Sequence, residues 1–369
     1  MPGAEGPVPS GRLPGGLTPP APDEWSPRHQ TPATGPPAPD TLVIQTAHLG
    51  DVVLTLPLLI RLAERSGPVD VVTTPEAAPL VTGHPAVRRV IPFDKHGTAR
   101  GPGGLRRLAA ELRGAGYARA ILVQGSLRTS LLAWLAGIPN RTGFARAPGS
   151  VLYTTRRPRP DRGHMSERLL ALDPGSPTVP PPWLYPATTT QQRVAAWLGE
   201  AALDGDFTVL APYARWGTKQ WPGFPELAVR LTGPLVLVGG PGDRAAALAL
   251  AARDPARIRN AAGVLSLPET AALIARARVV VANDSLALHL ATAVGRPVVA
   301  VFGPTVPGFG FGPLSGEVVE HAGLACRPCS AHGPATCPLG HHHCMRELGV
   351  EAVESAVSIA RGSGQAGWG

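Results

Sequence analysis

The chain is poor in aromatic residues and has no long apolar run, and each shortage excludes a class of protein. Phe, Trp and Tyr make up 5% of the 369 residues, whereas hydrophobic residues reach 44%, a balance typical of α/β cores built from Ala, Leu and Val. No apolar run attains the roughly 18–20 residues that cross a bilayer. The N-terminus also lacks the continuous apolar segment of a secretory signal. We therefore expect a cytoplasmic protein.

Acidic residues are in the minority. The chain has 34 Lys and Arg against 26 Asp and Glu, which gives a net charge of +8. Such a charge favours acidic partners, such as phosphorylated sugars, nucleotides or an anionic membrane surface. The alternative is Arg enrichment without a function, since Ala, Gly, Pro and Arg are all abundant, as in GC-rich genomes. The basic residues are not interleaved with aromatic ones, so we expect no nucleic-acid binding.

Cysteine is scarce, and all four cysteines lie near the C-terminal end, beside a run of three histidines at 341–343. Thiols of cytosolic chains serve metals or redox chemistry more often than disulfides, so the spacing makes a structural zinc site a candidate. The second C-x2-C of a four-cysteine zinc ribbon is missing, which leaves reduced packing thiols or a disulfide pair as alternatives. The candidate ligands are Cys326, Cys329, Cys337 and Cys344.

The rest of the chain alternates between short apolar strands and helical segments. This alternation indicates βαβ units and parallel sheets. The expected strands are 41–46, 69–73, 89–92, 120–124, 207–211, 235–238, 277–281 and 298–302. The expected helices are 52–65, 105–113, 128–136, 191–198, 225–231, 244–252, 287–294 and 350–360, with a helical patch at 165–172.

The length and the break in this alternation predict two domains. A chain of 369 residues exceeds one ordinary domain, and an Arg- and Pro-rich stretch at 156–182 interrupts the pattern. We predict an α/β protein with two Rossmann-like domains that face each other across a cleft. The predicted divisions are a disordered Pro- and Gly-rich tail at 1–40, domains at 41–190 and 191–361, and a flexible end at 362–369.

Polar residues follow three of the predicted strands, at the edge where open α/β sheets bind ligands. Asp284 and Ser285 follow one strand and open the helix that contains His289, and Thr305 follows the next. A helix N-terminus with a hydroxyl and free N–H groups suits a phosphate, which indicates a nucleotide-type ligand. Lys219 follows a third strand, where its ammonium would stabilise a departing diphosphate. The alternative for Lys219 is a solvent-exposed loop lysine.

Asp51 lies in the loop between the first predicted strand and the first predicted helix. A helix N-cap is the commoner role for Asp at that position, and the helix dipole would leave the carboxylate ionised but weakly basic. It would act as a general base only on a hydroxyl held close in a closed cleft. His48 is a second candidate base or an orienting partner, or a loop histidine without a role.

A glycine-rich loop follows the predicted strand at 235–238. The sequence from Gly239 to Arg244 lacks the full G-x-G-x-x-G fingerprint, because Pro241 intervenes and Arg244 occupies the third glycine position. We therefore do not expect a nicotinamide dinucleotide site. The loop could still contact a nucleotide, with Asp243 available to a ribose hydroxyl.

Several of these segments, in this order, resemble glycosyltransferase family 9, the heptosyltransferases that build the inner core of lipopolysaccharide. The segment Cys337–Met345 resembles the heptosyltransferase II branch in particular. The likeness covers about residues 41–361. The segments that carry it are Leu42–Pro57, Gln124–Ser130, His164–Arg168, Thr218–Pro222, Asn283–His289 and Phe302–Thr305.

The resemblance implies a GT-B fold and an inverting glycosyltransferase that needs no metal. The N-terminal domain would bind a glycan or glycolipid acceptor, with peripheral contact at the inner face of the membrane, and the C-terminal domain a nucleotide-sugar, by default ADP-heptose. Asp51 matches the proposed general base of the family, and we place His48 and Arg128 on the acceptor side. The residues matching the donor and phosphate site are Lys219, Asp284, Ser285, His289, Gly303 and Thr305.

Two departures from the family pattern leave alternatives open. Leu286 stands where the family usually has Gly, which crowds the approach to the donor, and Ala47-His48 replaces a pair of small hydroxyl residues. A catalytically degenerate nucleotide-sugar-binding protein is one alternative. A GT-B nucleotide-sugar epimerase is another, although that class favours paired glutamates where this chain has Leu288 and His289.

Overall fold

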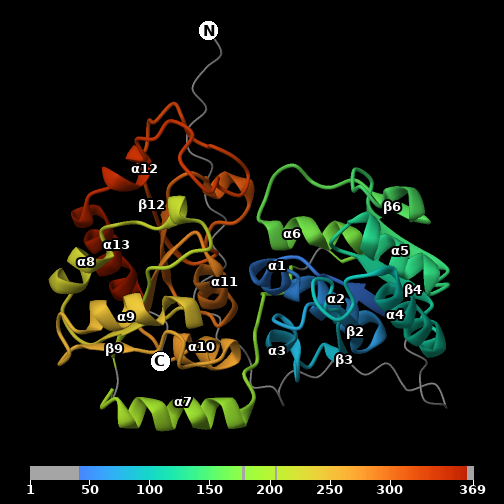
Figure 1. Ribbon diagram of the computed structural model, residues 1–369, viewed down its shortest axis with the longest axis horizontal. Coiled ribbons are helices and arrows are strands. Elements are labelled where there is room, and N and C mark those ends of the chain that lie inside the picture. Colours follow the sequence, from blue (N-terminus) through green and yellow to red (C-terminus); the bar gives the residue numbers. More distant parts are fainter. Residues whose placement is uncertain (1–40, 177–178, 204–205, 364–369) are drawn as a thin grey trace.

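The computed structural model describes residues 41–176, 179–203 and 206–363, which form two lobes, each built on a six-stranded sheet (Figure 1). This arrangement confirms the predicted pair of Rossmann-like α/β domains. Within the described residues, no helix is both long and apolar enough to cross a membrane. The expected tail at 1–40 lies outside the described residues, as do 364–369.

The N-terminal sheet is parallel throughout and has the strand order β3-β2-β1-β4-β5-β6. Its central strands are buried on both faces by helices, which explains their continuous apolar sequence. The strands are β1 (Thr41–Ile44), β2 (Val69–Thr73), β3 (Val87–Pro92), β4 (Arg119–Leu122), β5 (Asn140–Phe144) and β6 (Thr155–Arg157). The helices are α1 (Leu49–Leu54), α2 (Leu56–Ser66), α3 (Ala78–Val81), α4 (Pro102–Ala115), α5 (Leu127–Leu135) and α6 (Met165–Leu169), with 3-10 turns η1 (Ser150–Leu152) and η2 (Leu170–Leu172).

The C-terminal sheet repeats this topology, with the order β12-β11-β10-β7-β8-β9. Its strands are β7 (Thr208–Ala211), β8 (Leu235–Leu237), β9 (Ile258–Asn260), β10 (Val279–Asn283), β11 (Val298–Phe302) and β12 (Gly316–Glu320). The helices are α7 (Thr188–Glu200), α8 (Phe224–Arg230), α9 (Arg244–Ala251), α10 (Leu267–Ile274), α11 (Leu286–Ala293), α12 (His343–Arg346) and α13 (Val350–Ser363). The 3-10 turns are η3 (Gly217–Lys219), η4 (Pro241–Asp243) and η5 (Pro307–Phe309). α13 therefore runs two residues into the end predicted to be flexible.

The helix expected at 52–65 is in fact two helices. α1 ends at Leu54 and α2 begins at Leu56, with Thr55 between them. Pro57 lies in the first turn of α2, where its missing N–H costs nothing, but it cannot donate to the turn before it. The break turns α1 out of line with α2 and gives the Asp51 turn its own short helix.

The two lobes meet along the carboxyl edges of their sheets. α1, which follows β1, packs against α11, which follows β10. One buried apolar cluster contains residues of both lobes, among them Val53 on α1 and Leu288 on α11. The chain crosses between the lobes before α7, and α7 packs on α10 along the lower edge of the C-terminal lobe in Figure 1. Ligand-binding edges of both sheets thus face the same seam.

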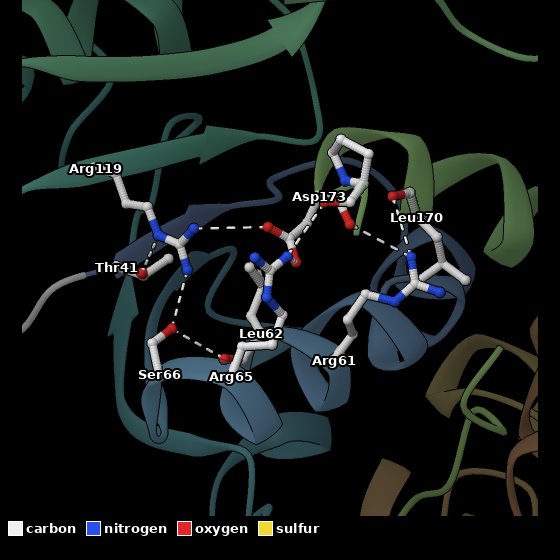
Figure 2. Close-up of polar contacts among 9 residues, drawn as sticks. Thr41, Arg61, Leu62, Arg65, Ser66, Arg119, Leu170 and Asp173 are labelled. Atoms are coloured by element: carbon white, nitrogen blue, oxygen red, sulfur yellow. Dashed lines mark hydrogen bonds and ion pairs between the residues drawn. The ribbon is translucent and has the colours of Figure 1, made fainter. Parts of the chain in front are cut away.

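At the opposite edge, Asp173 ties the chain leaving the N-terminal sheet back onto α2 (Figure 2). Its buried carboxylate pairs with Arg65 at 2.9 Å and with Arg119 at 3.6 Å. Arg61 donates to the backbone oxygen of Asp173 at 3.4 Å, and Arg119 also donates to Ser66 Oγ at 3.0 Å. This cluster lies at the amino end of β4, so it anchors the connection to the second lobe away from the ligand-binding edge.

Candidate functional site

The turn after β1 presents Asp51 at the carboxyl edge of the N-terminal sheet. Asp51 is the third residue of α1, and its Oδ2 accepts the backbone N–H of His48 at 3.1 Å. This bond is the carboxylate half of a capping box, so Asp51 does cap the helix, although His48 holds the N-cap position itself. Thr55 Oγ1 donates to the backbone oxygen of Asp51 at 2.7 Å and fixes the next turn. The Asp51 carboxylate is therefore held in one place while remaining partly exposed.

His289 of α11 lies at the seam between the lobes and is only 8% exposed. A Cβ atom on Gly50 would lie 2.7 Å from His289 Cδ2, so this close approach of α1 to α11 requires glycine. Burial lowers the pKa of His289; the charges of Asp284 and Asp51 raise it, and that of Lys219 lowers it further. His289 therefore lies close enough to Asp51 of one lobe and to Lys219 of the other for both charges to act on its pKa.

Three predicted donor-side residues converge in the C-terminal lobe. Lys219 Nζ pairs with Asp284 Oδ2 at 2.6 Å, and Thr305 Oγ1 donates to the same oxygen at 2.6 Å. They come from the loops after β7, β10 and β11, three neighbouring strands of the sheet. All three side chains are largely buried, so the solvent-exposed alternative for Lys219 is wrong. The result is a charged cluster at the point where the strand order reverses.

The rest of the predicted donor residues lie on the same edge. Ser285 is the N-cap of α11, and among the described residues its hydroxyl makes no capping bond to the first turn, so it is available to a ligand. Gly303 follows β11, where a Cβ would lie 2.6 Å from Met345 Cε. Asp243 lies one strand further along, after β8, and its Oδ2 accepts the N–H of Gly240 at 2.8 Å.

Two residues without a predicted role hold these loops in place. Asn283 is fully buried; its Oδ1 accepts the N–H of Trp221 at 3.1 Å and its Nδ2 donates to Pro212 O at 2.9 Å. Arg327 donates to Thr305 O at 2.9 Å and pairs with Glu320 at 2.8 Å. A polar residue at the end of a buried strand is a signal for Asn283. Nothing in the sequence around Arg327 indicated its partners.

On the acceptor side, the two predicted residues are already engaged. The His48 ring Nδ1 lies 3.0 Å from Arg215 NH1 of the other lobe, so His48 contributes to the contact between lobes. Arg128 donates to Lys95 O at 3.2 Å and stacks over the ring of Phe93 at 5.1 Å, so it braces the loop after β3. That loop carries Lys95, whose ammonium bonds the backbone oxygen of Thr46 beside the Asp51 turn. Lys95 is a cation at this edge that sequence reasoning missed.

The four cysteines do not gather into the candidate zinc site. Within residues 41–176, 179–203 and 206–363, no three Cys, His, Asp or Glu side chains gather into a set that could hold a metal ion. All four are free thiols, and Cys344 is buried in the apolar core beside Met345 while the other three lie on surrounding loops. Reduced thiols, one of the alternatives, describe what the structure shows.

The segment that carries these cysteines covers the donor-side loops instead. Cys329 N–H donates to Pro304 O at 2.8 Å, and the His342 ring Nε2 lies 2.8 Å from Thr218 O. Gly333, at φ +79°, lies so close that its Cβ would be 2.9 Å from Lys219 Cε. The segment therefore packs closely on the Lys219 side chain and restricts its movement.

Comparisons with known proteins agree with this geometry. The family model for glycosyltransferase family 9 (heptosyltransferase) matches residues 105–343. The chain is 31% identical to lipopolysaccharide heptosyltransferase 2 of Escherichia coli over 291 residues, which cover 73% of this chain and 84% of that protein. It is 32% identical to lipopolysaccharide heptosyltransferase 1 of Pseudomonas aeruginosa over 311 residues, covering 78% and 85%.

The fold agrees as well. The solved structure of E. coli ADP-heptose lipopolysaccharide heptosyltransferase II superposes with a TM-score of 0.73 at 25% identity, covering 88% of this chain and 99% of that one. This match extends over both lobes and identifies the fold as GT-B. The chain therefore belongs to glycosyltransferase family 9, the heptosyltransferases, and is a glycosyltransferase.

Proposed function

We propose that the protein transfers a heptose from ADP-heptose to a hydroxyl group of the lipopolysaccharide inner core, with inversion at the anomeric carbon and without a metal ion. The observation that carries the proposal is the close approach of the α1 turn, which holds Asp51, to His289 of the C-terminal lobe, at the edge where Lys219 and Thr305 converge on Asp284. The printed names of the relatives supply the donor and the acceptor class.

The donor diphosphate would bind at the C-terminal lobe. Lys219, the Thr305 hydroxyl and the N-terminus of α11 at Ser285 lie together there and provide one cation and several hydrogen-bond donors. These groups stabilise negative charge growing on the departing diphosphate, which is the task that a divalent metal performs in other transferases. The pairing of Lys219 with Asp284 keeps the ammonium oriented before the donor arrives.

The acceptor would bind on the N-terminal side, near Asp51. The Asp51 carboxylate takes the proton of the acceptor hydroxyl, whose oxygen forms a bond to the anomeric carbon as the bond from that carbon to the diphosphate oxygen breaks. ADP leaves on the C-terminal side. Because attack and departure occur on opposite faces of the sugar, a single displacement inverts the configuration.

Neutral His289 would act by position. Its imidazole lies against Gly50 at the seam between the lobes, and burial lowers its pKa, which favours the uncharged form. A charged imidazolium beside Lys219 would add a second cation at this point. The neutral ring instead contacts Gly50 and keeps α1 in register with α11.

Substitution of Asp51 by Asn tests the role of the base. Asn can still accept the His48 N–H, so the turn should fold, and D51N should bind ADP as the wild type does by calorimetry while transfer falls by at least about a hundredfold, the range of general-base catalysis. Asp254→Asn, a surface carboxylate bonded within its own turn to Arg257, is the matched control and should transfer normally. Undiminished transfer by D51N would move the base to His48.

The second candidate function is donor binding without transferase activity, and Leu286 is the residue that favours it. Leu286, the first residue of α11, is partly buried against the interlobe cluster at the point where the family usually has Gly. If Leu286 blocks the donor, no ADP-, UDP- or GDP-sugar should raise the melting temperature of the wild type, and Leu286→Gly should restore stabilisation by one of them.

A further inference from the structure

The outward face of α5 is apolar along its whole length. Leu127 and Trp134 are 56% and 51% exposed, and Leu131 and Leu135 on the same face are partly exposed. A surface helix ordinarily turns polar residues to solvent. Arg128 is the one charged residue between Leu127 and Leu135, and its guanidinium is bonded to the loop after β3 rather than spread over this face.

The turn beside α5 extends the apolar face. η1 packs against α5, where Gly149 N–H donates to Gly125 O at 3.0 Å and Ser130 Oγ lies 3.2 Å from Tyr153 OH. Val151, in the middle of η1, is 72% exposed. We call the set Leu127, Leu131, Trp134, Leu135 and Val151 the α5 patch. Contiguous exposed apolar surface of this kind marks an interaction site.

Basic residues surround the α5 patch. The Arg113 guanidinium bonds the backbone oxygen of Leu135 at one end of α5, and Arg156 Nε donates to Ser150 O at 2.8 Å beside Val151. Arg106 and Arg107 are exposed on α4, which packs beside α5, and Arg146 is exposed on the loop before η1.

The positive charge of the whole chain is concentrated in this region. Residues 95–172 contain 14 Lys and Arg against 3 Asp and Glu, whereas the remainder has 20 against 23. The net charge of the protein therefore comes from the part of the N-terminal lobe around the patch.

We propose that the α5 patch docks on an anionic membrane surface. An exposed Trp with Leu and Val neighbours suits the headgroup boundary, and each arginine near an anionic bilayer adds about 1 kcal/mol of attraction. A second copy of this chain would bring two basic rims together, which like-charge repulsion disfavours. An anionic bilayer complements both parts of this surface, because its acyl boundary suits the apolar centre and its headgroups suit the basic rim.

The position of α5 suits the proposed function, on which this step rests. α5 follows β4, whose loop residue Gln124 bonds Thr46 at the end of β1, next to the Asp51 turn. In Figure 1, α5 lies on the outer side of the N-terminal lobe, away from the C-terminal lobe. Docking through α5 would hold the N-terminal lobe, which carries the proposed acceptor edge, on the membrane that contains a lipid-linked acceptor, and would leave the donor lobe facing the aqueous side.

Vesicle sedimentation tests the proposal with the full chain. Vesicles of phosphatidylcholine with about one third phosphatidylglycerol should bind the wild type, more weakly as salt is raised, and pure phosphatidylcholine should bind it poorly. The triple variant L127S/W134S/V151S should bind anionic vesicles at least tenfold more weakly. The matched control V229S/L248S/I359S removes three comparably exposed apolar side chains from the C-terminal lobe and should bind normally.

Three outcomes would overturn the proposal: full binding by the triple variant, equal loss in the control variant, or a wild-type dimer in sedimentation velocity that the triple variant dissociates, since the patch would then bind another copy. The proposed function is tested separately. Transfer to a delipidated, water-soluble acceptor should be the same in wild type and triple variant. Vesicle binding without any transfer would refute the transferase assignment alone.

Discussion

At the scale of single residues, the site depends on Gly50, because glycine has no Cβ atom to collide with His289. The absent Cβ lets α1 approach His289, and through it the Asp51 turn approaches the Lys219 cluster. The sequence indicated Asp51, Lys219, Asp284 and Thr305 because each follows a strand at a ligand-binding edge. It could not indicate that His289 packs against Gly50 beside Asp51, because that contact joins residues from different lobes. Their catalytic and binding roles stay predictions.

Gly50→Ala should therefore damage the seam. The new methyl group must displace a buried ring, and overpacking of this kind costs about 1–3 kcal/mol of unfolding free energy. Urea unfolding of G50A and wild type measures the loss. Gly114→Ala is the control, since Gly114 lies in α4 with nothing within 4 Å of its Cβ and Ala favours helices. If G50A is as stable as G114A, the space between Gly50 and the His289 ring is wide enough for a methyl group, and the close approach of α1 to α11 is refuted.

At the scale of elements, the sequence predicted the buried strands well and the edge strands poorly. β1, β2, β7, β10 and β11 are apolar runs flanked by loops and were predicted within two residues at each end. β5, β6, β9 and β12 were missed. Their sequences mix Arg, Asn, Gly, Thr and Glu with few apolar residues, because β6, β9 and β12 are at a sheet edge, β5 is next to one, and all four are only partly covered. Partner strands rather than local pattern decide their structure.

The turn between α3 and β3 contains a histidine that should make the free energy of unfolding depend on pH. His84 Nδ1 accepts the N–H of Ala86 at 3.0 Å and its Nε2 lies 3.0 Å from Trp183 O in the connection between lobes. Burial lowers the pKa of His84 to about 4, although the hydrogen bond to the backbone of Trp183 acts in the opposite direction and raises it. Between about 6.5 and 4 the unfolded chain binds a proton that the folded chain does not, so stability falls as pH is lowered through this window.

The expected loss at His84 is up to about 1.4 kcal/mol for each pH unit in the window. His164, whose pKa burial also lowers to about 4, adds a similar dependence. Urea unfolding of wild type and His84→Gln at pH 7.5 and pH 5.0 measures it, because Gln cannot be protonated and carboxylate effects are common to both proteins. The wild type should lose more stability than the variant between the two pH values. Parallel losses would mean that folding does not lower the pKa of His84.

At the scale of the whole molecule, two lobes of the same strand order are joined by specific contacts. Met165 N–H donates to Gly310 O at 2.7 Å, Arg168 donates to Phe309 O at 3.1 Å, and Leu184 N–H donates to Ala293 O at 2.8 Å. The lobes themselves could be predicted from the interrupted alternation of strands and helices. Their closeness could not, since these bonds use backbone oxygens, which no sequence pattern marks.

The buried cluster that contains both Val53 and Leu288 has a calorimetric consequence. Two domains that merely share a linker melt independently, each with its own heat-absorption peak. Here neither half can expose its share of the common cluster without exposing that of its neighbour. Differential scanning calorimetry should therefore record one peak whose van't Hoff and calorimetric enthalpies agree, and a pair of resolved peaks would show that the halves are thermodynamically separate.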